Sequence, residues 1–214
     1  PVVRQYAARE TRRNFKEWSV KGDGMLMMVH EGPVGRVAAE VEAVDVLAAQ
    51  CGLTRADDQV AAHWMENRNH VPSWTELFDQ DLVVDTIEIS GSWSNIELIY
   101  DQSIADVSAV EGVVAVSAHS SHAYRTGVNL YFTFAGLSDD PQVLENIYLA
   151  CWHAVMEATA AHGGGVAHHH GIGRVRKPYL VHDLGEAGVA LLRTVKNAVD
   201  PEGLMNPGNL LPDA

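Results

Sequence analysis

Apolar residues recur along this chain with the two periods that distinguish helices from strands. Intervals of three and four mark one stripe, which consists of Val34, Val37, Val41, Val44, Ala48 and Cys51. This spacing places the side chains on one face of an α-helix. Pro33 fits the first turn of a helix, and Gly52 fits its end. We therefore expect a helix between these two residues, with its apolar face packed on a core.

Other segments carry the short apolar runs or the alternation that is typical of strands. They are residues 25–30, 83–90, 113–119 and 128–135. Successive strand residues point to opposite faces. One face of the last segment is expected in the core and consists of Val128, Leu130, Phe132 and Phe134. The opposite face is polar enough to line a cleft and carries Asn129, Tyr131 and Thr133.

Helical periodicity also appears in other parts of the chain. We expect helices at residues 57–68, 93–110 and 141–162, and a last helix lined by Leu184, Leu191, Val195 and Val199. Trp93 is expected to point inward. Cys51 and Cys151 lie on apolar helix faces, which is typical of buried, reduced thiols in a cytosol.

The order of these elements predicts an α+β fold. We expect a ferredoxin-like antiparallel sheet of about four strands covered by helices, followed by a C-terminal helix and an extended tail. Residues 201–214 form this tail, because prolines and glycines interrupt regular structure there. Residues 1–21 are charged and weakly periodic, and we interpret them as a linker or helical arm before a domain at 22–214.

The net charge of −13 argues against general nucleic-acid binding. The charge is uneven, since residues 1–21 hold six of the fifteen cations; a solvated helix face explains them more simply than a ligand. The sequence has no signal-peptide pattern and no apolar run of about 18 residues. We expect a cytoplasmic protein without a transmembrane segment, with peripheral membrane contact left open for the full-length enzyme.

The most distinctive stretch is residues 163–177, where five glycines, three adjacent histidines and three cations fall within fifteen residues. Glycine lets a ligand approach the main chain closely, and imidazole can pass protons near neutral pH. Arginine offers a planar fork for carboxylate or phosphate. The stretch therefore indicates a site for an anionic substrate at which protons move.

Two simpler interpretations stay open. The stretch can be a glycine-rich loop whose histidines bond to backbone groups. It can also bind metal, but His168 and His170 would face one way and His169 the other in an extended segment. Zinc needs three or four converging ligands, and the sequence has no Cys-x-x-Cys or His-x-x-x-His pattern. We therefore predict no metal.

Several motifs together resemble the C-terminal domain of FAD-linked oxidases. The strongest are Gly-Gly-x-x-x-His-His-His-Gly-Ile-Gly-Arg at 163–174 and the ending Asp-Pro-Glu-Gly-Leu-Met-Asn-Pro-Gly-Asn at 200–209. Residues 121–134 and the looser match 85–88, with Trp93 behind it, complete the pattern. Within the family, the chain most resembles the alkyldihydroxyacetonephosphate synthase branch. Related 2-hydroxy-acid dehydrogenases carry a metal-binding histidine where this chain has Tyr131, which favours that branch.

The resemblance implies roles for particular residues. Tyr131 occupies the position of the family's catalytic tyrosine, and His168, His169 and His170 would position the substrate and relay protons. His169 and Asn206 would contact the FAD cofactor. Arg68 matches a substrate-binding arginine in a poorly matching context, and a surface arginine is an equal alternative there. For Arg174, we infer phosphate binding from its charge.

The resemblance implies that this chain is the substrate-side part of an FAD-dependent enzyme. The branch reaction exchanges the acyl group of acyl-dihydroxyacetone phosphate, a lipid-like anionic substrate, for an alkyl ether without net redox change. Oxidation of a 2-hydroxy acid is the alternative activity. A further alternative is a binding or assembly domain, whose acidic helical surface would suit subunit contacts such as a homodimer. The sequence has no Gly-x-Gly-x-x-Gly fingerprint and no initial Met, so we expect a fragment that is inactive without an N-terminal FAD-binding domain.

Overall fold

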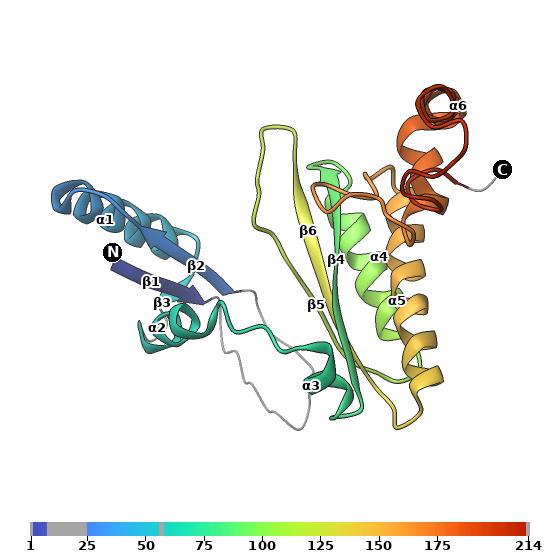
Figure 1. Cartoon of the computed structure of the whole chain (residues 1–214). Coiled ribbons are helices and arrows are strands. Elements are labelled where there is room, and N and C mark those ends of the chain that lie inside the picture. The colour runs from blue at the N-terminus through green and yellow to red at the C-terminus, as the bar shows by residue number, and fades with distance from the viewer. Residues whose placement is uncertain (1, 8–24, 56–57, 213–214) are drawn as a thin grey trace. The chain divides into compact units, whose positions relative to one another are not determined.

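The computed structural model describes residues 2–7, 25–55 and 58–212. The chain divides into two compact units, Pro1–Ser73 and Trp74–Ala214, each of which is described by itself (Figure 1). This boundary differs from the one expected after residue 21. The candidate site lies in the second unit.

The first unit contains a small antiparallel sheet in the order β2-β1-β3, in the part of the chain that the structure describes. Its elements are β1 (Val2–Ala7), β2 (Met25–His30), α1 (Val34–Gln50), β3 (Thr54–Arg55) and α2 (Asp58–Asn67). The strand at Val2–Ala7 contradicts the helix or linker expected there, and residues 8–24 of that expected arm lie outside the described residues. The predicted helices at α1 and α2 are confirmed.

A second antiparallel sheet, in the order β4-β6-β5, is the framework of the second unit. Its strands are β4 (Leu82–Ser92), β5 (Val113–His119) and β6 (Gly127–Leu137). The α+β class with covering helices is confirmed, but three strands rather than about four share this sheet within the described residues. The reason is that Met25–His30 pairs with β1 in the first unit. In the sheet of the second unit, β6 is the central strand. Its residue Tyr131 pairs with Glu88 of β4 on one side and with His119 of β5 on the other.

The core of the second unit lies between this sheet and two long helices. α4 (Ile96–Ser108) and α5 (Pro141–Ala161) run side by side along one face of the sheet (Figure 1). Phe132 and Phe134 point into this core and are each 1% exposed, as predicted. Because side chains alternate along a strand, Tyr131 and its neighbour Glu88 lie on the sheet face away from the helices. That face therefore carries the polar groups.

Two side chains that were expected inside lie at the surface. Trp93 is 54% exposed, because α4 begins only at Ile96 and the indole N–H donates to the backbone oxygen of Tyr124. Cys51 is exposed at the end of α1, whereas Cys151 is buried as predicted. Burial raises the pKa of the Cys151 thiol to about 12.

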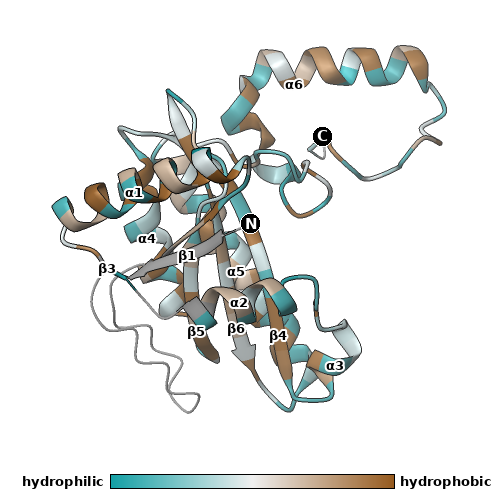
Figure 2. Cartoon of the chain, turned by 90° about the vertical axis from the view of Figure 1, so that its left-hand side faces the viewer, coloured by the Kyte–Doolittle hydropathy of each residue, from teal (hydrophilic) through white to brown (hydrophobic). Residues whose placement is uncertain are grey.

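Shorter elements and the last helix complete the second unit. They are α3 (Trp74–Phe78), the 3-10 helix η1 (Lys177–Tyr179) and α6 (Leu180–Val199), which is interrupted at Gly185. Hydrophobic residues, coloured brown, alternate with hydrophilic residues, coloured teal, along α6 (Figure 2). Its predicted apolar stripe is exposed, by between 45% and 67%, at Leu184, Leu191, Val195 and Val199. None of the helices in the described ranges has the length and apolar character needed to cross a membrane.

The tail after α6 contains turns but no helix or strand over its described residues, 201–212. Asp200 ends the helix and accepts hydrogen bonds from the backbone N–H groups of Leu204 and Met205. Further along, the backbone N–H of Leu210 donates to the oxygen of Gly173 at 3.1 Å. The tail therefore returns to the loop that follows the three histidines.

Candidate active site

A glycine hinge brings the histidines to the polar face of the sheet. α5 ends at Ala161, and Gly163 adopts a left-handed conformation with φ of 69°. Gly165 then pairs with Ser90 of β4 through two backbone hydrogen bonds of 2.8 and 3.0 Å. A Cβ atom on Gly164 would lie 2.9 Å from the Ser90 oxygen, so only glycine fits between strand and helix here. The hinge places residues 168–170 beside β4.

Glu88 is the buried centre of the site and has no exposed surface. Its Oε2 accepts the backbone N–H groups of His169 at 3.0 Å and His170 at 2.9 Å. Its Oε1 lies 3.2 Å from Nδ1 of His168, 2.7 Å from Nδ1 of His169 and 3.4 Å from the amide nitrogen of Asn129. Hydrogen bonds of this kind offset the cost of burying a carboxylate.

These neighbours determine the charge of the Glu88 carboxyl. Burial alone would raise its pKa, but the backbone N–H groups of His169 and His170, the charge of His170 and the amide of Asn129 together lower the pKa to about 2. Glu88 is therefore ionised at neutral pH and acts only as a hydrogen-bond acceptor.

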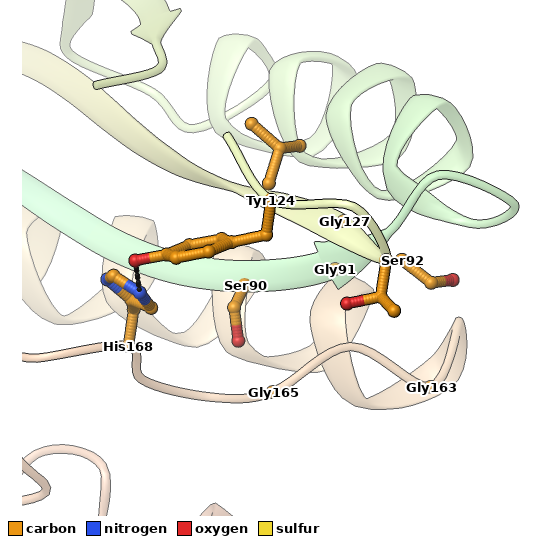
Figure 3. Close-up of a pocket in the computed structure, with 10 residues that line it drawn as sticks. Ser90, Gly91, Ser92, Tyr124, Gly127, Gly163, Gly165 and His168 are labelled. Atoms are coloured by element: carbon orange, nitrogen blue, oxygen red, sulfur yellow. Dashed lines mark hydrogen bonds between the residues drawn. The ribbon is translucent and has the colours of Figure 1, made fainter. Parts of the chain in front are cut away.

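Two tyrosines complete the cluster, one on each of two histidines. The hydroxyl of Tyr131 lies 3.2 Å from Nε2 of His169. The hydroxyl of Tyr124 lies 2.9 Å from Nε2 of His168, the contact marked by the dashed line in Figure 3. His119 stacks on the Tyr131 ring at 4.9 Å, and burial lowers the pKa of His119, which favours its neutral form.

The structure thus brings together Tyr131 and all three predicted histidines. The Tyr131 ring lies 6.1 Å from that of His169 and 5.3 Å from that of His170. This arrangement allows proton exchange between phenol and imidazole. The catalytic roles of these residues stay predictions.

The predicted cationic residues are placed differently. Arg174 is exposed beside the histidine loop in sequence, whereas Arg176 is buried and fixes that loop. The Arg176 guanidinium donates to the backbone oxygens of Gly171 and Glu88, at 3.2 and 3.1 Å, and lies 4.6 Å from the Trp152 ring. The Arg176 guanidinium is therefore held by contacts within the fold, whereas Arg174 is exposed to solvent.

The two remaining predicted residues are exposed. Arg68 belongs to the first unit, where its guanidinium lies 5.7 Å from the Trp64 ring. Asn206 lies in the tail with φ of 45°, and its side-chain oxygen accepts from Asn209 at 2.7 Å. Their proposed contacts with substrate and FAD stay predictions.

Glu88, Tyr124 and His122 lie in the segments 85–88 and 121–134 that resemble the family, but sequence reasoning gave none of them a role. His122 lies with its ring 5.4 Å from the rings of both His168 and His169. A signal for Glu88 exists, because an acid stands in the middle of the apolar strand 83–90. Its cross-strand pairing with Tyr131, however, needs the register of β4 against β6.

A pocket of about 310 Å³ opens beside Tyr124 and His168 (Figure 3). Its wall is formed by Ser90, Gly91, Ser92, Tyr124, Thr126, Gly127, Val128, Gly163, Gly165 and His168. Hydroxyl groups and glycine backbone thus dominate the lining, which suits a ligand that exchanges hydrogen bonds. Tyr131 is not part of this wall.

Among the residues that the structure describes, two groups of side chains have potential metal ligands within 4.8 Å of one another. They are His122 with His168 and His169, and Glu88 with His169 and His170. The Nδ1 atoms of His168 and His169 already lie at hydrogen-bonding distance from Glu88, so a metal would have to displace these contacts. The expectation of no metal stays a prediction.

The described residues fit the reactive ring of a flavin better than its phosphates. His169 and His170 expose 49% and 35% of their side chains, so the planar surfaces of their imidazoles are available to a ring laid over them. The sheet beside the histidine loop is antiparallel, and the sequence has no glycine-rich dinucleotide fingerprint. A pyrophosphate would therefore need another domain.

These features define an α+β domain in which a glycine-hinged histidine loop meets tyrosines over a buried carboxylate. The comparison with known families agrees, because the family model "FAD linked oxidases, C-terminal domain" matches residues 3–210. The chain belongs to this family.

Individual relatives come from several branches of FAD-linked enzymes. Alkyldihydroxyacetonephosphate synthase of Trypanosoma brucei brucei is 30% identical over 92% of this chain. An uncharacterized FAD-linked oxidoreductase of Escherichia coli is 28% identical over 99%, and mitochondrial D-lactate dehydrogenase [cytochrome] 1 of Saccharomyces cerevisiae is 24% identical over 72%. A solved alkyldihydroxyacetonephosphate synthase covers 96% of the chain with a TM-score of 0.57 at 17% identity, a likeness of fold.

The chain spans only part of these relatives. It covers 33% of the trypanosomal synthase, 46% of the bacterial oxidoreductase and 39% of the solved synthase chain. The activities of the whole relatives therefore bear on this chain only through a proposal.

Proposed function

We propose that this chain is the substrate-side domain of an FAD-dependent enzyme that exchanges the acyl group of acyl-dihydroxyacetone phosphate for an alkyl ether. The observation that carries the proposal is the Glu88–His169–Tyr131 arrangement, with contacts of 2.7 and 3.2 Å. The trypanosomal relative named as an alkyldihydroxyacetonephosphate synthase supports it.

The arrangement gives Tyr131 the character of a base. Since the ionised Glu88 carboxylate lies 2.7 Å from Nδ1 of His169, it favours the tautomer with the proton on Nδ1. The Nε2 atom of neutral His169 is then an acceptor, and the Tyr131 hydroxyl donates to it. The phenol oxygen then takes a proton from the substrate carbon while its own proton moves to His169. Glu88 stabilises the imidazolium that results, as the carboxylate does in a Ser-His-Asp triad.

The other predicted residues hold the reactants. His168 and His170 flank His169 and orient the substrate, and the exposed guanidinium of Arg174 binds the phosphate. His169 and Asn206 contact the flavin, which supplies the redox-active ring when bound. Each of these roles needs only side chains that are exposed or partly exposed.

The partner in this proposal is an FAD-binding domain, joined to this chain or assembled with it; the two together are called the holoenzyme below. The exposed apolar stripe of α6 supports it, since an amphipathic helix normally buries such a face. A lipid-like substrate also suits a location in the cytoplasm next to a membrane surface. A homodimer is compatible with the same exposed surface.

Oxidation of a 2-hydroxy acid is the second candidate, favoured by the yeast D-lactate dehydrogenase among the relatives. In this case the imidazoles would take the hydroxyl proton, and an arginine would hold the carboxylate. Tyr131 stands where the related dehydrogenases place a metal-binding histidine, which weighs against this candidate.

One experiment separates the two. The holoenzyme is given acyl-dihydroxyacetone phosphate with a long-chain alcohol in one arm, and D-lactate alone in the other. We expect ether product in the first arm and no loss of the oxidised flavin absorbance in the second. Flavin bleaching by D-lactate without ether formation would establish the second candidate instead.

A further inference from the structure

The site contains a second phenol–imidazole pair that matches the first. Tyr124 contacts Nε2 of His168 at 2.9 Å, as Tyr131 contacts Nε2 of His169 at 3.2 Å. The Nδ1 atoms of both histidines converge on the same oxygen of Glu88, at 3.2 and 2.7 Å, and lie 2.9 Å from each other. One buried carboxylate thus contacts two phenol–imidazole pairs, Tyr124 with His168 and Tyr131 with His169.

The charge of Glu88 determines which ring nitrogen of His168 and of His169 carries the proton. An ionised carboxylate accepts hydrogen bonds and donates none, so its hydrogen bond with His168 favours a proton on that Nδ1 atom. Its charge, 2.7 Å from Nδ1 of His169, favours a proton there as well. Each Nε2 atom is then an acceptor, and each tyrosine donates its hydroxyl proton to it. Both phenol oxygens consequently present lone pairs to whatever binds next to them.

We propose that Tyr124, paired with His168, is a second acid–base residue of this site, and that Glu88 positions both phenol–imidazole pairs. The two pairs differ in access. Tyr131 is 9% exposed, whereas Tyr124 is 51% exposed and lies on the wall of the 310 Å³ pocket (Figure 3). One carboxylate balances one imidazolium, so the pairs accept protons one at a time.

The role of the second pair rests on the proposed function and adds a proton acceptor to the exchange reaction. The reaction removes a proton from the substrate carbon and another from the hydroxyl of the entering alcohol. Tyr131 serves the carbon and later returns that proton. At Tyr124, the alcohol O–H bond breaks, its proton goes to the phenol oxygen, and the phenol's own proton moves to Nε2 of His168.

The remaining bonds and the released proton are accounted for at the pocket. The alkoxide oxygen forms the new C–O bond to the substrate carbon, and the fatty acid departs as a carboxylate. The proton held on His168 leaves through Tyr124, which is open to solvent. The overall change is acyl-dihydroxyacetone phosphate plus alcohol to alkyl-dihydroxyacetone phosphate plus carboxylate and one proton.

The positioning role of Glu88 can be measured on the 214-residue chain without flavin or substrate. Nitrogen-15 NMR of the imidazoles reports which ring nitrogen carries the proton. We expect Nδ1–H tautomers at His168 and His169, lost in Glu88→Gln and kept in Glu157→Gln. Glu157 is a matched control, because it lies 3.8 Å from His153, whose ring contacts the Tyr179 hydroxyl at 2.6 Å. An Nε2–H tautomer at either site histidine in the wild type would overturn the proposal.

The role of Tyr124 is tested on the holoenzyme by measuring two products. In Tyr124→Phe, fatty-acid release should persist while ether formation falls on the order of 100-fold. The control Tyr179→Phe should retain both rates. Equal retention of both rates in Tyr124→Phe would refute the second acid–base role. If wild-type holoenzyme forms no ether at all, the proposed function fails, while the tautomers still decide whether Glu88 positions both pairs.

Discussion

The Oε1 atom of Glu88 lies 2.7 Å from Nδ1 of His169, although 81 residues separate them in the sequence. A buried carboxylate without partners would cost several kcal/mol. The loop supplies those partners, and the carboxylate in turn holds two loop N–H groups. Strand β4 and the histidine loop therefore stabilise each other's conformation, and the orientation of the site follows from that contact.

Removing the Tyr131 hydroxyl tests the first phenol–imidazole pair. We expect Tyr131→Phe to lower turnover of the holoenzyme by about 10²–10⁴-fold, because the proton acceptor at the substrate carbon is lost. FAD content should stay the same, since the ring and its stacking on His119 are kept. Turnover is measured with saturating substrate, and FAD by absorbance. Tyr100→Phe on α4 is the control, and near-normal turnover in Tyr131→Phe would contradict the role.

The low pKa of Glu88 predicts a loss of stability in acid. Because the folded-state pKa, about 2, lies below the ordinary value of 4.5, ionised Glu88 stabilises the fold above pH 4.5. This contribution is lost as the pH falls from 4.5 toward 2. Urea unfolding of the chain at pH values across this window measures it.

Glu88→Gln should flatten that part of the stability profile, because its amide does not titrate. The variant is expected to be less stable than the wild type at pH 7, with the difference shrinking toward pH 2. Glu157→Gln should follow the wild-type profile, since Glu157 is exposed. A Glu88→Gln profile parallel to that of the wild type would show that Glu88 has an ordinary pKa.

Gly127 is expected to be intolerant of a side chain. A Cβ atom there would lie 2.0 Å from the backbone oxygen of Gly91 on the neighbouring strand, where only backbone can yield. We expect Gly127→Ala to lower the free energy of unfolding by about 1–3 kcal/mol. Gly35→Ala, where nothing lies within 4 Å, should cause no loss. Urea denaturation compares the two, and equal midpoints would contradict the predicted clash.

The hydrogen bonds of the histidines predict that the domain does not depend on metal. Zinc would compete for the Nδ1 atoms of His168 and His169, which Glu88 already holds. EDTA treatment should leave the thermal midpoint of the chain unchanged. The check is thermal unfolding with and without EDTA, together with the metal content of the dialysed protein. One tightly held zinc per chain would assign the histidine cluster to a metal site.

Most of the helices and strands could be predicted from residue patterns within single elements. Alternation in 128–135 placed Phe132 in the core and Tyr131 on the polar face, because strand geometry alone decides this. The histidine run and its glycine hinge likewise stand together in the sequence. The strand that pairs with Met25–His30 could not be predicted, since apolar runs do not specify which strands pair.

Contacts between distant segments were the part that the sequence did not reveal. Glu88 and Tyr124 contact the histidines only because β4, the segment before β6 and the loop after α5 converge in space. Arg174 and Arg176 stand two residues apart as similar cations in the sequence, but Arg176 is buried against Trp152 whereas Arg174 is exposed. Burial depends on packing, which periodicity does not determine at single positions in loops.

The exposed stripe on α6 gives the last prediction. Leu191 is 63% exposed, so Leu191→Glu should change the free energy of unfolding of the chain by no more than about 0.5 kcal/mol. In the holoenzyme, the same change buries a charge in the proposed contact with the FAD-binding domain and should reduce retained FAD or the thermal midpoint.

A matched variant makes this test specific to the stripe. Asn197→Glu adds the same charge on the same helix, at a position about a third of a turn around the axis from Leu191. We expect this variant to leave the holoenzyme unchanged. Flavin absorbance after gel filtration and the thermal midpoint are measured for both. If the two variants behave alike in the holoenzyme, the α6 stripe faces solvent there too, and the FAD-binding domain must contact another surface.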